Sequence, residues 1–180
     1  MRKALYILGI LNDGDASWLA TNGKSRPVKA GEVIIQQGVP IDSVYILIDG
    51  QLQVYSGSVE ITRLLAGEIV GEVSFVDNRP PSASVKAVVD SQVLSVPNAA
   101  LRSKLQKDLG FASRFFLSLA AFLADRLRDA NARLTGVQKG TEEDDLDELS
   151  GDLLENIALA STRFDMIVKR LASQSSGSKS

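Results

Sequence analysis

The spacing of hydrophobic and polar residues predicts a β-rich section in the first half of the chain. From Val28 to Val96, short runs of β-branched and aromatic residues alternate with Gly, Pro, Asn or Asp, a pattern typical of an antiparallel sandwich or barrel. The predicted strands are 33–36, 44–48, 51–55, 60–65, 84–89 and 92–96. Asp49 and Gly50 separate the second strand from the third and predict a tight hairpin, because both residues tolerate a positive φ.

After Pro97 the hydrophobic period becomes helical and predicts one long helix over 109–134. Residues spaced alternately by four and three form a heptad seam along it, namely Phe116, Ala120, Leu123, Leu127, Ala130 and Leu134. Such a seam predicts a homodimer interface. Its N-terminal half carries further apolar residues that we expect to lie against the β section, and a helix packed wholly on its own domain is the alternative.

The two ends of the chain have helical patterns of their own. Residues 4–21 predict two short helices separated at 12–15, with Asp13 or Asp15 capping the second. Trp18 is the one tryptophan of the chain and is interpreted as a packing residue. A second amphipathic helix is predicted over 149–172, and its apolar stripe needs a surface to pack on.

These patterns divide the chain into five parts. They are an N-terminal helical segment (1–27), a β section with its long helix (28–134), an acidic linker (135–148), an amphipathic helix (149–172) and a disordered Ser/Gly-rich tail (173–180). Six acidic residues occupy the seven positions 142–148. Such a run is interpreted as a solvated segment, with a docking site for a basic partner as the alternative.

Composition excludes most familiar catalytic chemistry. The 180 residues include no cysteine and no histidine, so disulfides, Cys/His metal sites and histidine-dependent nucleophilic catalysis are excluded. The formal net charge is −2, which gives no reason to expect a DNA partner. The first apolar run, 4–11, is too short to span a bilayer. We therefore expect a cytoplasmic protein without metal, without a membrane partner and without enzymatic activity.

One segment, 65–85, concentrates candidate binding chemistry. It runs through Gly71 and Glu72 into a short apolar stretch that predicts a single helical turn, and it returns through two prolines to small polar residues. Backbone N–H groups around a helix start bind phosphate, and the hydroxyls of Ser82 and Ser84 add donors. The carboxylate of Glu72 is suited to accept a hydrogen bond from a sugar hydroxyl.

The order of these elements resembles the cyclic nucleotide-binding domain of the catabolite-activator superfamily. The resemblance covers roughly 4–134 and rests on three segments, 29–38 (KAGEVIIQQG), 44–54 (VYILIDGQLQV) and 67–74 (GEIVGEVS). It implies a mainly β fold with flanking helices: an antiparallel double-stranded β-helix (jelly roll), followed by a long dimerisation helix and the C-terminal amphipathic helix. It also implies a cyclic nucleotide ligand, cyclic AMP or cyclic GMP.

In that family the segment corresponding to 71–84 is the phosphate-binding cassette. The resemblance implies that Glu72 contacts the ribose 2′-hydroxyl and that backbone groups contact the ligand. The complete set of candidate ligand-binding residues is Gly71, Glu72, Val73, Ser74, Arg79, Ser82, Ala83 and Ser84.

The sequence departs from the family at two points. The family places an arginine where this chain has Pro81, so the charge on the phosphate and one backbone donor are lost. Arg79 either reaches the phosphate instead or is a solvated turn residue. In addition, the 46 residues after Leu134 are too few for a winged helix-turn-helix domain, which again argues against DNA binding.

Two functions remain open from the sequence. The first is a regulatory module that senses a cyclic nucleotide and signals through its dimer helix and residues 149–172 to a protein partner. The second is a ligand-free adaptor or scaffold whose cassette is degenerate, as Pro81 suggests. An enzyme is disfavoured, because jelly-roll enzymes commonly hold metal with histidine and this chain has none.

Overall fold

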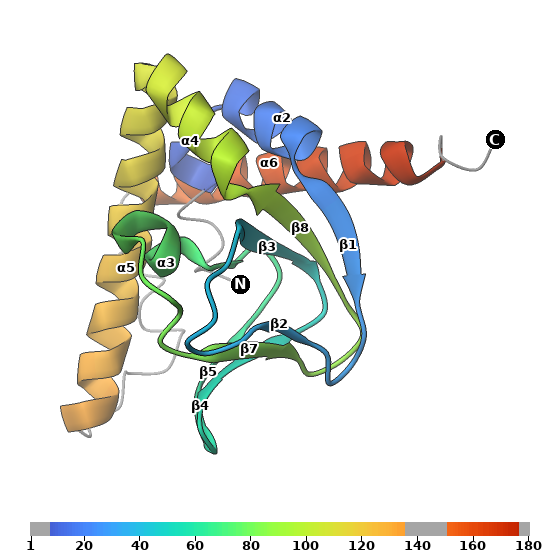
Figure 1. Ribbon diagram of the computed structural model, residues 1–180. Coiled ribbons are helices and arrows are strands. Elements are labelled where there is room, and N and C mark those ends of the chain that lie inside the picture. Colours follow the sequence, from blue (N-terminus) through green and yellow to red (C-terminus); the bar gives the residue numbers. More distant parts are fainter. Residues whose placement is uncertain (1–7, 136–150, 177–180) are drawn as a thin grey trace.

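The computed structural model describes residues 8–135 and 151–176 and shows a β-roll flanked by helices (Figure 1). After a helical turn at 8–10, the elements are α2 (Asp13–Asn22), β1 (Lys24–Val28), β2 (Val33–Ile35), β3 (Ser43–Asp49), β4 (Leu52–Ser56), β5 (Val59–Leu64), β6 (Ile69–Val70), α3 (Glu72–Asp77), β7 (Ser84–Ala87), β8 (Ser91–Pro97), α4 (Asn98–Lys107), α5 (Leu109–Thr135) and α6 (Gly151–Ser176). The strands form two antiparallel four-stranded sheets, in the orders β1-β8-β3-β6 and β2-β7-β4-β5. The predicted mainly β fold with flanking helices is thus confirmed.

In the first sheet, the central strand β3 is buried on both of its faces. Along β3, Tyr45 and Leu47 belong to a core inside the roll, whereas Val44 and Ile46 belong to a core beneath the helices. This alternation follows from the two-residue period of a strand. Helices α2, α4 and α6 lie over the strands of this sheet, and α5 runs past α3 along one side of the roll (Figure 1).

Two strands, β1 and β6, were not predicted from the sequence pattern. β1 reads KSRPV and is mostly exposed, so it lacks the hydrophobic alternation that predicts a strand; its pairing with β8, Arg26 opposite Val93, defines it. The predicted boundary between 27 and 28 therefore falls inside a strand. β6 has only two residues and is held by Tyr45 and Ile46 of β3. The other strands lie where the sequence predicts them, within a few residues.

The hairpin predicted at Asp49 and Gly50 is wrong. β3 and β4 belong to different sheets, so the chain crosses between sheets at this point instead of folding back. Of the two turn residues, Gly50 has a positive φ, at 95°, and Asp49 does not. Ser91 packs so closely that a Cβ on Gly50 would lie 2.2 Å from its Oγ. A positive φ identifies a tight turn but does not choose the strand that pairs next. The observed hairpin joins β4 to β5 around Gly57, whose φ is 57°.

The N-terminal helices are broken at the predicted place but capped by a different residue. Asn12 is the N-cap of α2: its side chain accepts the Asp15 N–H, and its own N–H donates to Asp15 Oδ2, both at 2.9 Å. The predicted cap at Asp13 or Asp15 is therefore corrected to a reciprocal capping box. Trp18 packs on Phe111, with ring centroids 5.6 Å apart, as its interpretation as a packing residue requires. Residues 4–7 lie outside the described residues.

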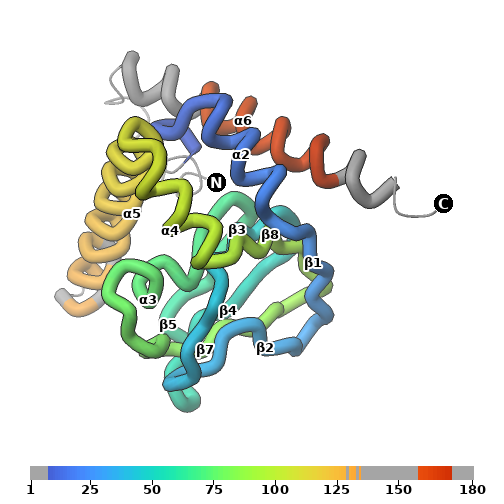
Figure 2. The backbone as a smooth tube through the Cα atoms, turned by 45° about the horizontal axis from the view of Figure 1, so that its top comes forward, coloured from blue at the N-terminus to red at the C-terminus, as the bar shows by residue number. Residues whose placement is uncertain are grey.

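Both long helices form. The helix predicted over 109–134 corresponds to α5, and that predicted over 149–172 corresponds to α6, which continues through Ser176. The predicted disordered tail is thus helical over 173–176. Residues 177–180 and 136–150, which include all of the acidic linker but its first residue, fall outside the described residues. α6 lies alongside α2, as the tilted view of Figure 2 also shows.

Candidate functional site

The candidate cassette crosses from one sheet of the roll to the other. It leaves the end of β6 and enters the second sheet at β7, and α3 forms its first part. Gly71 is the N-cap of α3, with φ at 87°. A Cβ there would lie 2.8 Å from Ile41 Cδ1 and 3.1 Å from the Ser43 carbonyl oxygen. Glycine at this position therefore permits both the left-handed turn and the close approach of the β2–β3 loop.

The side chain of Glu72 is buried and paired with a residue from α5. Glu72 is 2% exposed, and Arg126 Nη1 donates to its Oε1 at 2.6 Å. The Arg126 guanidinium also lies over the Phe122 ring, 4.5 Å from its centroid. Its Nη2 is buried and has no hydrogen-bond partner, although buried donors are normally satisfied.

Two opposing effects act on the Glu72 carboxyl. Burial raises its pKa above the usual glutamic acid value, because desolvation penalises the charged form. The Arg126 guanidinium acts in the opposite direction by stabilising the carboxylate. The guanidinium that opposes the effect of burial thus comes from α5, more than fifty residues away in sequence.

The C-terminal end of α3 is held by a second arginine. Arg102 of α4 donates from Nη2 to the Phe75 carbonyl oxygen at 2.8 Å, and its guanidinium lies 4.6 Å from the centroid of the Phe75 ring. Asn78, at a positive φ of 59°, ends α3 and accepts a further hydrogen bond from Arg102. Arginines of α4 and α5 thus fix α3 at its two ends.

The remaining candidate residues lie along the same loop in different environments. Val73 is 48% exposed, Ser74 and Ala83 are half-buried, and Arg79 and Ser82 are exposed. The Oγ of Ser84 is already engaged, because it accepts the Gln37 N–H at 2.9 Å. The Pro81 carbonyl likewise accepts the Gly38 N–H at 2.9 Å. The part of the cassette that leads into β7 is therefore hydrogen-bonded to the turn after β2.

Sequence reasoning missed Arg126 and Arg102, the two residues that position α3. For Arg126 a signal exists: it follows Phe122 by four positions and extends the stripe of α5 that faces the roll. The buried members of that stripe are Phe111, Phe115, Leu119 and Phe122. An arginine that continues a buried apolar stripe indicates a buried acidic partner, but the identity of that partner requires the fold.

The comparisons with known proteins address this segment directly. A family model described as cyclic nucleotide-binding domain matches residues 25–108. This segment is therefore similar to the cyclic nucleotide-binding domain family. The match includes the whole cassette and all strands but the first residue of β1, so the resemblance read from the sequence is confirmed.

Curated relatives of this chain are larger proteins. The chain is 27% identical over 113 residues to the cGMP-dependent protein kinase egl-4 of Caenorhabditis briggsae (61% of this chain, 15% of the relative). It is 31% identical over 121 residues to the Pycsar effector protein BcPycTIR of Burkholderia cepacia (67% and 40%). It is 26% identical over 139 residues to a cAMP-dependent protein kinase regulatory subunit of Hypocrea atroviridis (77% and 26%). The chain therefore spans at most 40% of the length of these relatives.

Solved structures show the same fold. A cyclic nucleotide-binding domain from Methylobacillus flagellatus superposes with a TM-score of 0.67 at 21% identity, over 76% of this chain and 85% of that chain. The catabolite activator protein of Thermus thermophilus gives a TM-score of 0.59 at 21% identity, over 92% and 85%. In the described parts of the chain, no helix has the length and hydrophobicity that a membrane span requires. Within the same residues, no group of three acidic, cysteine or histidine side chains is placed to hold a metal ion.

Proposed function

We propose that this chain is a non-enzymatic regulatory module that binds a cyclic nucleotide, cyclic AMP or cyclic GMP, at the cassette 71–84. The observation that carries the proposal is the buried Glu72 carboxylate, held at the start of α3 within the family segment. Burying a carboxylate is costly unless it is paired. Arg126 offsets this cost through one carboxylate oxygen, Oε1, and a carboxylate can accept more than one hydrogen bond. We infer that the remaining acceptor capacity of Glu72 serves a ribose hydroxyl of the ligand.

Pro81 predicts weak binding. A charged hydrogen bond of the kind lost here contributes about 1.5–3 kcal/mol, which corresponds to roughly ten- to a hundredfold in affinity. The exposed Arg79 is one replacement for the lost charge, and the buried Nη2 of Arg126 is a second donor near Glu72. We therefore expect an affinity lower than that of a cassette with its arginine in place.

Calorimetric titration of the full chain with cyclic AMP and with cyclic GMP tests the proposal. We expect saturable binding to one of them, weakened at least tenfold by Glu72→Gln, since the ribose hydroxyl then loses a charged acceptor. Glu60→Gln on β5 makes the same chemical change at an exposed position and leaves binding unchanged. Absence of binding to both nucleotides would contradict the proposal.

A second candidate function is a ligand-free adaptor. Two observations favour it: Pro81 stands in place of the family arginine, and Arg126 already occupies one oxygen of Glu72. If the chain is such an adaptor, we expect it to be folded and assembled, and to give no heat of binding with cyclic AMP or cyclic GMP. The same experiment therefore separates the two candidates.

The proposal includes a homodimer formed along α5, with output through α5 and α6 to a protein partner. Three residues of the predicted seam are strongly exposed in the single chain: Phe116 at 48%, Leu127 at 62% and Leu134 at 85%. Ala120 and Ala130 are also exposed, and Leu123 is partly buried against the helical core. An apolar stripe of this length facing water favours a second copy of the helix as its partner.

A further inference from the structure

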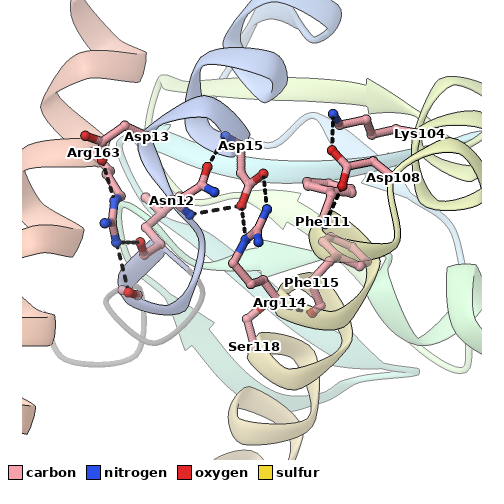
Figure 3. Close-up of polar contacts among 12 residues, drawn as sticks. Asn12, Asp13, Asp15, Lys104, Asp108, Phe111, Arg114, Phe115, Ser118 and Arg163 are labelled. Atoms are coloured by element: carbon pink, nitrogen blue, oxygen red, sulfur yellow. Dashed lines mark hydrogen bonds and ion pairs between the residues drawn. The ribbon is translucent and has the colours of Figure 1, made fainter.

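Three arginine–carboxylate pairs lie between the cassette and α6. Arg126 of α5 binds Glu72 of the cassette at 2.6 Å. Arg114, also on α5, binds Asp15 of α2 with Nε–Oδ2 at 2.6 Å and Nη2–Oδ1 at 3.0 Å. Arg163 of α6 binds Asp13 of α2 at 2.8 Å. Arg126 and Arg114 therefore lie on one helix, α5. Asp15 and Asp13 both lie in the first turn of α2, where Figure 3 shows them with Arg114 and Arg163.

Asp15 connects the cap of α2 to α5. Its side chain is 4% exposed, and its Oδ2 accepts both the Asn12 N–H at 2.9 Å and Nε of Arg114 at 2.6 Å. A shift of Arg114 relative to α2 must therefore weaken either the ion pair or the capping box. Because a cap fixes the backbone at the start of its helix, the conformation of 12–15 depends on the position of α5.

Arg163 fastens α6 to this same turn. The residue is 9% exposed, and its Nη1 donates at 2.9 Å to the carbonyl oxygens of Leu8 and Gly9, while Nε reaches Asp13. The carbonyls of 8 and 9 end the first helical turn, where a cation is favoured. Ala160, Ile167 and Leu171 are buried on the same side of α6. α6 is thus bound to the chain segment just before and at the start of α2, whose conformation depends on Asp15 and Arg114.

An aromatic chain runs parallel to these ion pairs. Phe75 of α3 meets Phe115 of α5 at 6.1 Å between centroids, Phe115 stacks on Phe111 at 5.6 Å, and Phe111 contacts Trp18 of α2 at 5.6 Å. Packed side chains of this kind transmit displacement because they cannot compress. The cassette and α2 are therefore connected through α5 by both polar and apolar contacts.

We propose that α6 is a regulated latch: its docking on α2 is energetically coupled to the Glu72–Arg126 pair at the cassette, with Arg114 and Asp15 carrying the coupling. This inference rests on the proposed function only for the identity of the ligand that would act on Glu72. A coupling free energy acts equally in both directions. Loosening the cassette pair must therefore loosen α6, and loosening α6 must loosen α3.

Hydrogen exchange of the ligand-free full chain tests the coupling in both directions. We expect Glu72→Gln to accelerate amide exchange in 158–171 of α6 by about tenfold, within the range of allosteric couplings. Arg163→Gln should accelerate exchange in 72–77 of α3 by a similar factor. Glu60→Gln and Lys169→Gln are the matched controls, since both change charge at exposed positions, and they should leave both segments unchanged.

General destabilisation is distinguished by a variant away from this route. Leu64→Ala weakens the core inside the roll and should accelerate exchange in β4 and β5 together with the helices. If Glu72→Gln leaves 158–171 at the wild-type rate, or accelerates it no more than β4 and β5, the inference is overturned. Should Arg163→Gln fail to fold, Asp13→Asn removes only the ion pair at a side chain that is 73% exposed.

The route through Arg114 has its own test. In an Arg114→Gln background, we expect Glu72→Gln to lose its effect on 158–171, because coupled residues are non-additive in a double-mutant cycle. Full additivity would overturn the assignment of Arg114 as the connecting residue. Arg128→Gln, an exposed arginine on the same helix, should leave the effect of Glu72→Gln intact.

Cyclic AMP and cyclic GMP then separate this inference from the proposed function. If either binds, exchange in 158–171 should change, and Arg163→Gln should shift its Kd by the same factor. Binding with no change in 158–171 overturns the latch and leaves the proposed function standing. If neither nucleotide binds, the proposed function fails, and the mutational exchange experiments still decide the latch.

Discussion

Gly50 and Gly57 have the same backbone handedness but different surroundings. Both have a positive φ, at 95° and 57°, which costs a residue with a side chain about 1–2 kcal/mol. A Cβ at Gly50 would also lie 2.2 Å from Ser91 Oγ, whereas nothing lies within 4 Å of one at Gly57. The crossing between the sheets therefore depends on Gly50 in two ways, and the β4–β5 hairpin depends on Gly57 in one.

We expect Gly50→Ala to lower the free energy of unfolding by about 2–4 kcal/mol, as strain and overpacking add. Gly57→Ala, the matched variant, should cost about 1 kcal/mol through strain alone. Equilibrium denaturation with urea measures both. Equal losses would show that Ser91 moves aside without cost.

Asp108 begins α5 and makes a pH-dependent contribution to the free energy of unfolding. Its carboxylate accepts the Lys104 ammonium and the Phe111 N–H, both at 2.8 Å, and these bonds, that of Lys104 foremost, lower its pKa below 3.8. A carboxyl whose pKa falls on folding stabilises the fold above its unfolded pKa, and the contribution disappears as pH falls through the folded pKa.

Asp108→Ala should therefore lower Tm by a few degrees at neutral pH, through loss of the cap. The Tm difference between variant and wild type should shrink as the pH is lowered through and below 3.8. Thermal melts over a pH series measure it. A Tm difference that persists undiminished in acid would show that the charge of Asp108 contributes nothing.

At the scale of elements, α5 divides its surface between two uses. One face carries Phe111, Phe115 and Phe122, which are almost completely buried against the roll and α2. The seam through Leu127 and Leu134 faces away and stays exposed. Residues spaced by three or four positions lie on one side of a helix. The buried set and the seam are two such series that begin at different residues, so they occupy different faces of α5.

We expect the wild-type chain of 19.3 kDa to sediment at about twice its mass, because the exposed seam pairs with a second copy. Leu127→Asp combined with Leu134→Asp should give a folded monomer, since both side chains are exposed in the single chain. Arg128→Asp adds negative charge on the same helix off the seam and should remain dimeric. A wild-type monomer at micromolar concentration would contradict the dimer.

At the scale of the whole molecule, two cores share one sheet. The core inside the roll contains Leu47 and Leu64, and the core beneath the helices contains Ile46 and Phe111. β3 contributes to both, because alternate residues of a strand point to opposite faces. We therefore expect the roll and the helices to unfold together.

Leu64→Ala tests this cooperativity. Leu64 is 1% exposed inside the roll, so the substitution should cost about 2–5 kcal/mol. The fluorescence of Trp18, in the other core, should report the same lowered midpoint as circular dichroism. Leu65→Ala, at a neighbouring leucine that is 46% exposed, should cost about 0.5 kcal/mol or less. A Trp18 transition that stays at the wild-type midpoint would show that the cores unfold separately.

The sequence alone determined the features that depend on local periodicity and on the residues of a contiguous motif. The strands from β2 to β5, the course of α5, the short helix at Glu72 and the break before α2 all follow from patterns within about a dozen residues. The sequence did not predict β1 and β6, because their hydrophobic pattern is weak and their pairing with β8 and β3 defines them.

Only the tertiary structure decided which distant groups meet. It turned the expected hairpin at Gly50 into a crossing between sheets, brought Arg126 onto Glu72, and placed α6 on α2 through the Arg163–Asp13 pair. Each of these depends on the free energy of burying a surface or a charge against a partner far away in sequence. A local pattern shows that a stripe or a charge must be covered, but the packing of the whole chain selects what covers it.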